Sequence, residues 1–509
     1  MDVLFISPGA GSNIYQGLSR DYSAVETPTW LLLLAESCRS VGASVGVIDV
    51  AAEKLSNQDV INRVEKINTK LIVFVVYGQN VNAGTANMSG AIELSSGMKK
   101  SGILQPIVFI GSHVQALPFD TLYNEKSIDI LCTNEGVYAL RNLLKLENFN
   151  TKTLEKIKGI GFRDAGKVII TDPEKIVPQD KMTVDLPGYA WDLLPYKDTP
   201  LDLYRSPMWH AEYDFKKRTP YAAIQTSLGC QFKCEFCMIN MINRSDNNRV
   251  GVASDYSGMR YWPTDFIINE FKKLIKMGVR TIRIVDEMFL LNPKHYVPLC
   301  TELAKLNVKD ELKMWAYSRV DTVRRPDILN LVRKAGVKWL ALGIESSNKK
   351  IRIESSKGKF DDVDIRNVIE QVHNEDIGVM ANYIFGLPGD DIDSMNETLE
   401  LSMDLCTIGW NAYPAMALPG TLLYKQAIQN KQKLPDDFQG YSFHSYHTYP
   451  LSTEYLTSQE ILKFRDDSFI KYHESQCFLD KISSKYGDTA VKNIQNMTKI
   501  KLKRKILGD

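Results

Sequence analysis

Three cysteines that lie within eight residues are the side chains of this sequence best placed to do chemistry. Cys230, Cys234 and Cys237 have the spacing C-x₃-C-x₂-C, and Gly229 before them allows a tight turn. Three thiolates at this spacing can bind three irons of a 4Fe–4S cluster, which leaves the fourth iron without a protein ligand. The spacing therefore predicts a cluster with one open iron.

The alternative for this loop is a zinc site. Structural zinc takes four ligands in pairs, and no other Cys or His lies close enough in the sequence to complete them. An open cluster iron can instead chelate the amino and carboxylate groups of S-adenosylmethionine, and an electron passed into the sulfonium then breaks a C–S bond. The other cysteines lie in apolar segments and are expected to be small buried hydrophobes; they are residues 38, 132, 300, 406 and 477.

The elements that must position this loop form a repeating strand–helix pattern. Strands are expected at residues 222–227, 281–285, 313–318, 339–343, 378–383 and 408–415. Helices are expected at residues 264–277, 296–306, 326–335, 363–374 and 391–405. Six such units predict a partial (β/α)6 TIM-type barrel, open on one side. The cysteine loop follows the first strand, where barrels of this kind place their chemistry.

The first third of the chain has a second alternation of the same kind. Apolar strands are expected at residues 3–7, 43–50, 71–76, 106–110 and 128–132. Helices between and after them are expected at residues 28–42, 57–67, 83–101 and 137–146. Apolar strands separated by helices indicate a doubly wound, Rossmann-like parallel sheet, which binds ligands at the carboxyl ends of its strands.

The α/β chain is thus expected to have four parts. A hairpin is predicted at residues 160–171, and residues 172–220 have no clear period. The predicted parts are a doubly wound domain at 1–145, a hairpin and linker at 146–220, the barrel at 221–425 and a helical C-terminal tail at 426–509.

Composition restricts the partners. The formal net charge of +1 gives no strong field toward nucleic acid or anionic lipid. The basic run at residues 499–506 is interpreted as a solvated helix end rather than a nucleic-acid arm. The first residues lack the pattern of a signal peptide, and no apolar run reaches the length of a membrane span. We therefore expect a cytoplasmic protein without a membrane span or a nucleic-acid partner.

The cysteine loop resembles the signature of the radical S-adenosylmethionine (SAM) superfamily, C-x₃-C-x-aromatic-C. Similar segments follow the later strands in order: Asp286-Glu287, Tyr317-Ser-Arg319, Gly343-Ile-Glu345, Asn382 to Gly389, and Pro419-Gly-Thr421. The resemblance implies that Phe236 packs beside the cofactor adenine and that Asp286, Glu287, Arg319 and Glu345 bind the cofactor. The alternative for the charged residues is a salt-bridged rim that supports the fold. A Gly-Gly pair usual in the family is missing before Glu287.

The first domain resembles the cobalamin-binding domain of one large subclass of that superfamily. The resemblance rests on Ser7-Pro-Gly9 and on the segments at 77–80 and 111–118, and it implies cobalamin contacts from Tyr77, Gln79, Gly111 and His113. The D-x-H-x-x-G motif that gives cobalt a histidine in some cobalamin proteins is absent. The alternative role of His113 is that of a loop histidine that hydrogen-bonds the backbone. The alternative role of the whole domain is that of an interaction module that binds no cofactor.

Together, these resemblances imply a radical SAM enzyme that uses a 4Fe–4S cluster, SAM and cobalamin. The implied activity is methyl transfer to an unactivated carbon of a sugar, lipid or natural-product intermediate, with electrons from a donor such as flavodoxin or ferredoxin. A radical rearrangement or cyclisation without methyl transfer and a non-catalytic cobalamin or redox sensor are the alternatives. No side chain is assigned as a catalytic residue, and the substrate, the lower cobalt ligand and the oligomeric state stay open.

Overall fold

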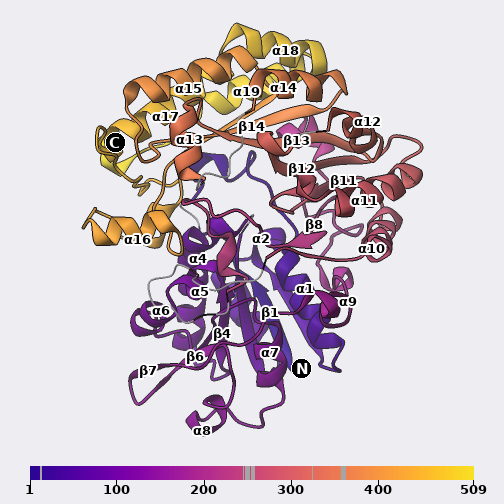
Figure 1. Cartoon of the computed structure of the whole chain (residues 1–509). Coiled ribbons are helices and arrows are strands. Elements are labelled where there is room, and N and C mark those ends of the chain that lie inside the picture. The colour runs from indigo at the N-terminus through magenta and orange to yellow at the C-terminus, as the bar shows by residue number, and fades with distance from the viewer. Residues whose placement is uncertain are drawn as a thin grey trace.

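Two sheets of mainly parallel strands organise the chain, one in its first third and one in its second half (Figure 1). The computed structural model describes residues 1–11, 14–78, 80–244, 246, 253, 258–323, 325–356 and 363–509. In Figure 1 the first sheet lies below the second, and the C-terminal helices cover the second.

The first sheet has the strand order β2-β1-β3-β4-β5-β6-β7. Its strands are β1 (Val3–Ser7), β2 (Val45–Asp49), β3 (Leu71–Val76), β4 (Ile107–Gly111), β5 (Ile130–Cys132), β6 (Ile160–Asp164) and β7 (Lys167–Ile170). The strands β1 to β5 are parallel, which confirms the doubly wound fold. The hairpin β6–β7 pairs antiparallel with β5, so the predicted hairpin extends this sheet.

Helices cover both faces of this sheet because successive side chains enter two separate cores. Phe5 and Val73 belong to one apolar cluster, whereas Leu4 and Phe74 belong to the other. The helices of this part are α1 (Thr29–Arg39), α2 (Val50–Glu53), α3 (Asn57–Glu65), α4 (Gly84–Lys100), α5 (Ser112–Ala116), α6 (Pro118–Asn124), α7 (Val137–Leu144), α8 (Thr151–Leu154) and α9 (Met182–Asp185). The strand order reverses between β1 and β3, which places a ligand crevice at their carboxyl ends.

The second sheet is a six-stranded partial barrel, as the sequence predicted. Its order is β15-β14-β13-β12-β11-β8, and every pair is parallel. The strands are β8 (Tyr221–Ile224), β11 (Thr281–Ile284), β12 (Lys313–Arg319), β13 (Val337–Glu345), β14 (Gly378–Phe385) and β15 (Gly409–Pro414). The helices are α10 (Thr264–Lys276), α11 (Pro293–Leu306), α12 (Pro326–Lys334), α13 (Lys349–Ser355), α14 (Ile365–Asn374) and α15 (Ile392–Leu405). The short strands β9 (Ser227–Leu228) and β10 (Arg260–Tyr261) pair beside it.

A one-turn helix, η5 (Trp209–Ala211), closes the amino-terminal end of the barrel. The Trp209 ring lies 4.8 Å from the ring of Trp315. The ring of His210 lies 5.0 Å from that of Trp339, and its Nε2 lies 2.9 Å from the carbonyl of Lys313, the first residue of β12. Ligands must therefore use the opposite, carboxyl end of the strands.

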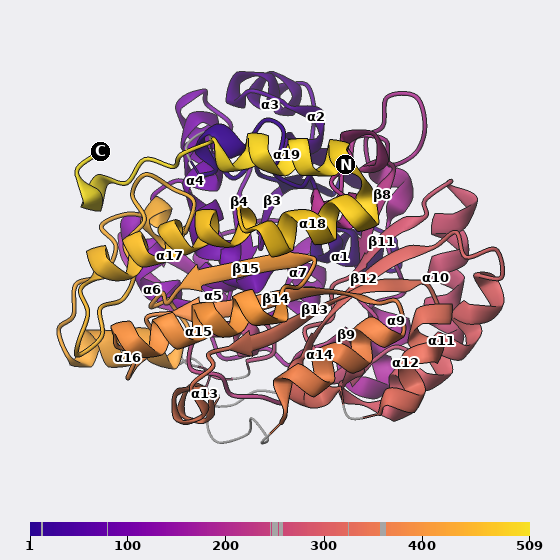
Figure 2. The ribbon, with the colours of Figure 1, turned by 90° about the horizontal axis from the view of Figure 1, so that it is seen from above.

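The C-terminal region is helical, as predicted, and α17 and α18 lie beside the edge of the barrel in Figure 2. Its helices are α16 (Leu422–Gln429), α17 (Ser458–His473), α18 (Gln476–Tyr486) and α19 (Asp488–Thr498). Cys406 and Cys477 form a disulfide. The prediction that both are isolated buried hydrophobes is therefore wrong, because the fold brings together two residues 71 positions apart.

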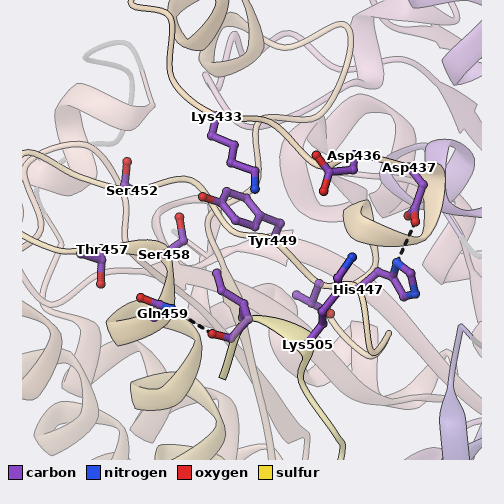
Figure 3. Close-up of a pocket in the computed structure, with 12 residues that line it drawn as sticks. Lys433, Asp436, Asp437, His447, Tyr449, Ser452, Thr457, Ser458, Gln459 and Lys505 are labelled. Carbon is purple, nitrogen blue, oxygen red and sulfur yellow. Dashed lines mark hydrogen bonds and ion pairs between the residues drawn. The ribbon is translucent and has the colours of Figure 1, made fainter. Parts of the chain in front are cut away.

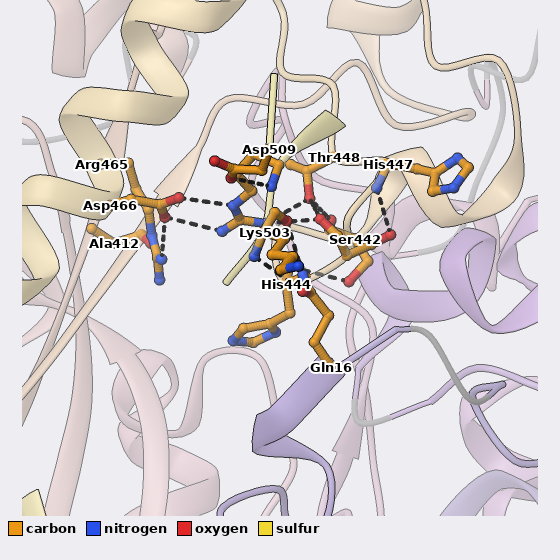
Figure 4. Close-up of polar contacts among 12 residues, drawn as sticks. Gln16, Ala412, Ser442, His444, His447, Thr448, Arg465, Asp466, Lys503 and Asp509 are labelled. Carbon is orange, nitrogen blue, oxygen red and sulfur yellow. Dashed lines mark hydrogen bonds and ion pairs between the residues drawn. The ribbon is translucent and has the colours of Figure 1, made fainter. Parts of the chain in front are cut away.

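The lysines of the basic run at the end of the chain are exposed, as expected, but the run is not the end of a helix. The last α-helix ends at Thr498, and Arg504 is only 1% exposed. Its guanidinium donates to Asp466 at 2.8 and 3.0 Å and to the carbonyl of Ser445 at 2.9 Å (Figure 4). The tail is thus held on α17 by an ion pair between the buried Arg504 and the partly buried Asp466. No helix among the described residues is long and apolar enough to span a membrane.

Candidate cofactor site

The cysteine loop leaves the carboxyl end of β8 through a turn that only glycine fits. Gly229 has φ +89°, and a Cβ there would lie 2.2 Å from Nδ2 of Asn243. Backbone hydrogen bonds then attach Glu235 to Ser355 at 3.0 Å and to Leu423 at 3.1 Å. The loop is therefore attached to α13 and α16 as well as to its own strand.

The three cysteines of the loop are free thiols that interact electrostatically with one another. Burial raises the pKa of Cys230 to about 12 and that of Cys234 to about 11, and the pKa of Cys237 is raised for the same reason. Protonated thiols lose their protons when they bind metal.

This donor set fits a 4Fe–4S cluster better than a single ion. Among the described residues, no three His, Cys, Asp or Glu side chains are arranged around one metal ion. A cubane cluster instead spreads its three thiolates over three irons. The three cysteines lie close together but do not surround one point, as the ligands of a single ion would. Their arrangement is compatible with a cluster that binds each thiolate through a different iron.

Phe236 and Arg319 make different contacts around this loop. Phe236 packs against an apolar cluster at the ends of β14 and β15 that includes Ile384 and Ala415. The Arg319 guanidinium is centred 3.8 Å from the Phe232 ring and forms a two-point pair with Asp321 at 2.8 and 2.5 Å. Its charge opposes the rise in the pKa of Cys234, so a fixed cation lies beside the loop.

Asp286 has a structural role that the sequence left as one of two alternatives. Its carboxylate accepts hydrogen bonds from the backbone and hydroxyl of Thr226 and from the hydroxyl of Ser227, each at 2.6 Å. These contacts hold the exit of β8, from which the cysteine loop starts. Asp286 therefore positions the loop.

Glu287 and Glu345 are carboxyl groups with different surroundings. Burial raises the pKa of each to about 7, with Arg283 opposing the rise for Glu287 and Arg319 opposing it for Glu345. Glu345 ends β13 at a bulge and has φ +66°. A strained backbone that is kept at the carboxyl end of a strand is typical of a functional position.

The residues predicted from the first domain lie at the carboxyl edge of its sheet. The Tyr77 hydroxyl accepts from Gln115 at 2.5 Å. Gly111 leaves no room for a side chain, because a Cβ would lie 2.2 Å from the carbonyl oxygen of Val76. Gln79 lies outside the described residues.

His113 is buried and lies in the short helix α5, not in a loop as one alternative expected. Its Nδ1 lies 3.2 Å from the hydroxyl of Thr85, and its ring lies 5.1 Å from that of Phe438 in η10 (Phe438–Tyr441). Burial lowers its pKa to about 4. The expected backbone bond is thus replaced by a side-chain contact, and Phe438 packs against the ring.

Contacts between the two sheets were not predicted. Arg260 of β10 pairs with Glu135 at 2.8 Å, both of them buried, and also donates to Asn243 at 2.7 Å. Arg244 donates to the backbone carbonyl of Gln115 at 2.6 Å. No sequence pattern joins residues so far apart. The loops at the carboxyl ends of both sheets therefore meet.

Unpaired polar atoms gather at this meeting place. In the described part of the chain, Oε1 of Gln115, Oδ1 of Asn240 and Nδ2 of Asn243 are buried without a hydrogen-bond partner. A buried polar group left unpaired costs about 1–3 kcal/mol. A polar ligand between the sheets would satisfy these atoms, so the site fits a large polar cofactor.

A separate pocket of about 590 Å³ lies in the C-terminal region (Figure 3). Lys433, Asp437, His447 and Lys505 are among its lining residues, and Asp437 pairs with His447 at 2.7 Å. It contains none of the predicted site residues.

Residues 224–402 match the profile of the radical SAM superfamily, so the chain has a radical SAM domain. An uncharacterized methyltransferase, PH0819, from Pyrococcus horikoshii is 23% identical over 478 residues, which are 93% of this chain and 92% of the relative. The hopanoid C-2 methylase of Rhodopseudomonas palustris is 26% identical over 42% of this chain and 39% of its own length.

Solved structures share the fold of the whole chain. The radical SAM methyltransferase TsrM from Kitasatospora setae, with cobalamin and a 4Fe–4S cluster bound, has a TM-score of 0.63 at 14% identity over 84% of this chain and 78% of its own. The cobalamin-dependent radical SAM enzyme OxsB has a TM-score of 0.64 at 14% identity over 97% of this chain and 72% of its own. Residues 224–402 thus match the radical SAM family, and the chain as a whole shares the fold of TsrM and OxsB.

Proposed function

We propose that the protein is a cobalamin-dependent radical SAM methyltransferase. The observation that carries this proposal is the meeting of the cysteine loop with the carboxyl edge of the doubly wound sheet. The Asn82 side chain after β3 accepts a hydrogen bond from the backbone of Met238, next to the last cluster cysteine, at 2.9 Å. A cofactor bound at that edge lies next to a cluster bound in the loop.

The chain's own residues bind and orient the cofactors. Cys230, Cys234 and Cys237 hold the cluster, which when reduced supplies the electron that breaks a C–S bond of SAM. Phe236 would pack beside the adenine of bound SAM. Glu287, Arg319 and Glu345 would offer charges of both signs to the amino, carboxylate and sulfonium groups.

The crevice of the first domain holds cobalamin, which when bound supplies a carrier for methyl groups. Tyr77 and Gly111 border it at the carboxyl ends of β3 and β4, and Gln79 is proposed as a further contact from the sequence alone. We assign no cobalt bond to His113, which is buried with its Nδ1 against Thr85 and its ring beside Phe438. The relatives named as methylases and methyltransferases support the transfer of a methyl group.

The substrate is a small molecule, with methyl transfer to an unactivated carbon of a sugar, lipid or natural-product intermediate, and the likeness to a hopanoid methylase is compatible with a lipid. Electrons come from a flavodoxin or ferredoxin. Reduced cluster thiols and an electron donor of this kind favour the cytoplasm, where a disulfide such as Cys406–Cys477 is uncommon.

Product analysis tests this proposal. The protein is reconstituted anaerobically with iron, sulfide and hydroxocobalamin, and incubated with SAM, a reductant and a panel of small molecules. Methyl transfer yields S-adenosylhomocysteine together with 5′-deoxyadenosine. 5′-Deoxyadenosine alone with a converted substrate would indicate rearrangement or cyclisation. The absence of both products, with cofactors bound, would indicate a sensor. Cys234→Ala is the control for product formed without the cluster.

A further inference from the structure

One side chain of the first domain reaches the cluster loop of the second. Asn82 lies in η2 (Val81–Ala83), between β3 and α4. Its Oδ1 accepts from the backbone N–H of Met238 at 2.9 Å, and its Nδ2 lies 4.0 Å from Sγ of Cys237, at the outer limit of a hydrogen bond to sulfur. The carboxamide therefore contacts the backbone and the thiol of the same short segment.

The orientation of this carboxamide follows from its partners. A backbone N–H can only donate, so the Asn82 atom that faces Met238 must be the oxygen. The amide nitrogen is then the atom that faces Cys237. An N–H donor is thus directed at a thiol that is expected to be a cluster ligand.

The backbone of Asn82 is held firmly by its own domain. Its N–H donates to the side chain of Asn80 at 3.0 Å, and the hydroxyl of Ser112 donates to the carbonyl of Val81 at 2.6 Å. Val81 is buried in the core. The β3–α4 loop is therefore tied to the start of α5, and Asn82 is placed by the fold of the first domain.

We infer that Asn82 is a positioning residue of the first domain that raises the reduction potential of the cluster in the second. Hydrogen bonds to the sulfurs of an iron–sulfur cluster are among the factors that set its potential. The reduced cluster carries one more negative charge than the oxidised one, so an N–H donor stabilises the reduced form more. The inference rests on the proposed cluster, and it assigns the doubly wound domain a part in electron transfer.

The test is an anaerobic redox titration of the reconstituted full chain, followed by electron paramagnetic resonance of the reduced cluster. Asn82→Leu keeps the size of the side chain and removes the donor, so we expect a more negative midpoint potential than in the wild type. Asn82→Asp keeps an acceptor for Met238 and places negative charge beside Cys237, so we expect a larger shift in the same direction.

Thr85→Val is the matched control. Thr85 is buried on the next turn of the same segment, and the change removes its contact with His113 but no contact with a cluster cysteine. Its potential should equal that of the wild type.

Equal potentials in the wild type, Asn82→Leu and Asn82→Asp would overturn the inference, and so would an equal shift in Thr85→Val. If Asn82→Leu assembles no cluster, the midpoint potentials of Asn82→Asp and Thr85→Val are compared instead. Equal potentials in these two variants would overturn the inference. A wild-type protein without any 4Fe–4S signal would contradict the proposed function itself, which is a different result from an unchanged potential.

Discussion

The affinity for SAM should depend on pH through Glu345. Burial raises the pKa of this carboxyl to about 7, with Arg319 opposing the rise, so the side chain is charged above pH 7 and neutral below it. The sulfonium and ammonium groups of SAM are attracted to the charged form. The affinity should therefore rise as the pH rises toward 7 and level off above it.

The expected magnitude follows from the charge of one carboxyl. About three-quarters of a group with a pKa near 7 is ionised at pH 7.5 and roughly 3% at pH 5.5. A pair of unit charges about 5 Å apart at an effective dielectric constant of 20 is worth about 3 kcal/mol, or roughly a factor of 100 in Kd. These values predict that Kd increases about 20-fold between pH 7.5 and pH 5.5. The uncharged variant Glu345→Gln should bind about 100-fold more weakly at pH 7.5 and show no such pH dependence.

Isothermal titration of the reconstituted, unreduced protein with SAM measures these constants. Burial also raises the pKa of Glu287 to about 7, so the titration is done in a Glu287→Gln background in which Glu345 is the carboxyl under test. Glu370→Gln, at an exposed position on α14, is the matched control. A Kd that does not change with pH, or a Glu345→Gln variant that binds as tightly as its parent at pH 7.5, would refute the assignment.

Three further predictions concern the cluster, the contact between the sheets and the first domain. Changing any one of the three cluster cysteines to alanine should abolish the visible absorption of the cluster and the cleavage of SAM. The control Cys300→Ala, at a buried position on α11, should keep both. Cleavage of SAM by a variant that lacks one cluster cysteine would count against the assignment. Glu135→Gln and Arg260→Met should each lower the free energy of unfolding by about 3 kcal/mol because each leaves a buried partner unpaired. The double variant should lose at least about 1 kcal/mol less than the sum in urea unfolding, and strict additivity would show that the pair is not coupled. His113→Ala should retain cobalamin with an unchanged absorption spectrum, because Thr85 and Phe438 hold the ring, and a spectral shift would indicate a cobalt ligand.

Local patterns in the sequence predicted the elements and the cysteine loop. The apolar runs of β3 and β4 and the six barrel strands appear where their periodicity placed them, because each pattern is complete within a few residues. The loop was predictable for the same reason, since all three thiols lie on one short segment.

Contacts between distant residues were not predictable in this way. The pair of Arg260 with Glu135 and the contact of Asn82 with the cysteine loop depend on how two sheets meet, which no local period encodes. The bond between Cys406 and Cys477 is of the same kind. The hydrogen-bond partners of Asp286 were also not predictable, because the sequence shows a carboxylate but not which hydroxyl groups lie around it in the fold.

The measurement that tests the central claim most directly is the cofactor content of the purified protein. The chain is reconstituted anaerobically with iron, sulfide and hydroxocobalamin, freed of unbound cofactor, and analysed by optical spectroscopy and by iron and cobalt determination. The account predicts one 4Fe–4S cluster and one cobalamin for each chain. A protein that keeps its cluster but retains no cobalt would contradict the claim that the first domain binds cobalamin.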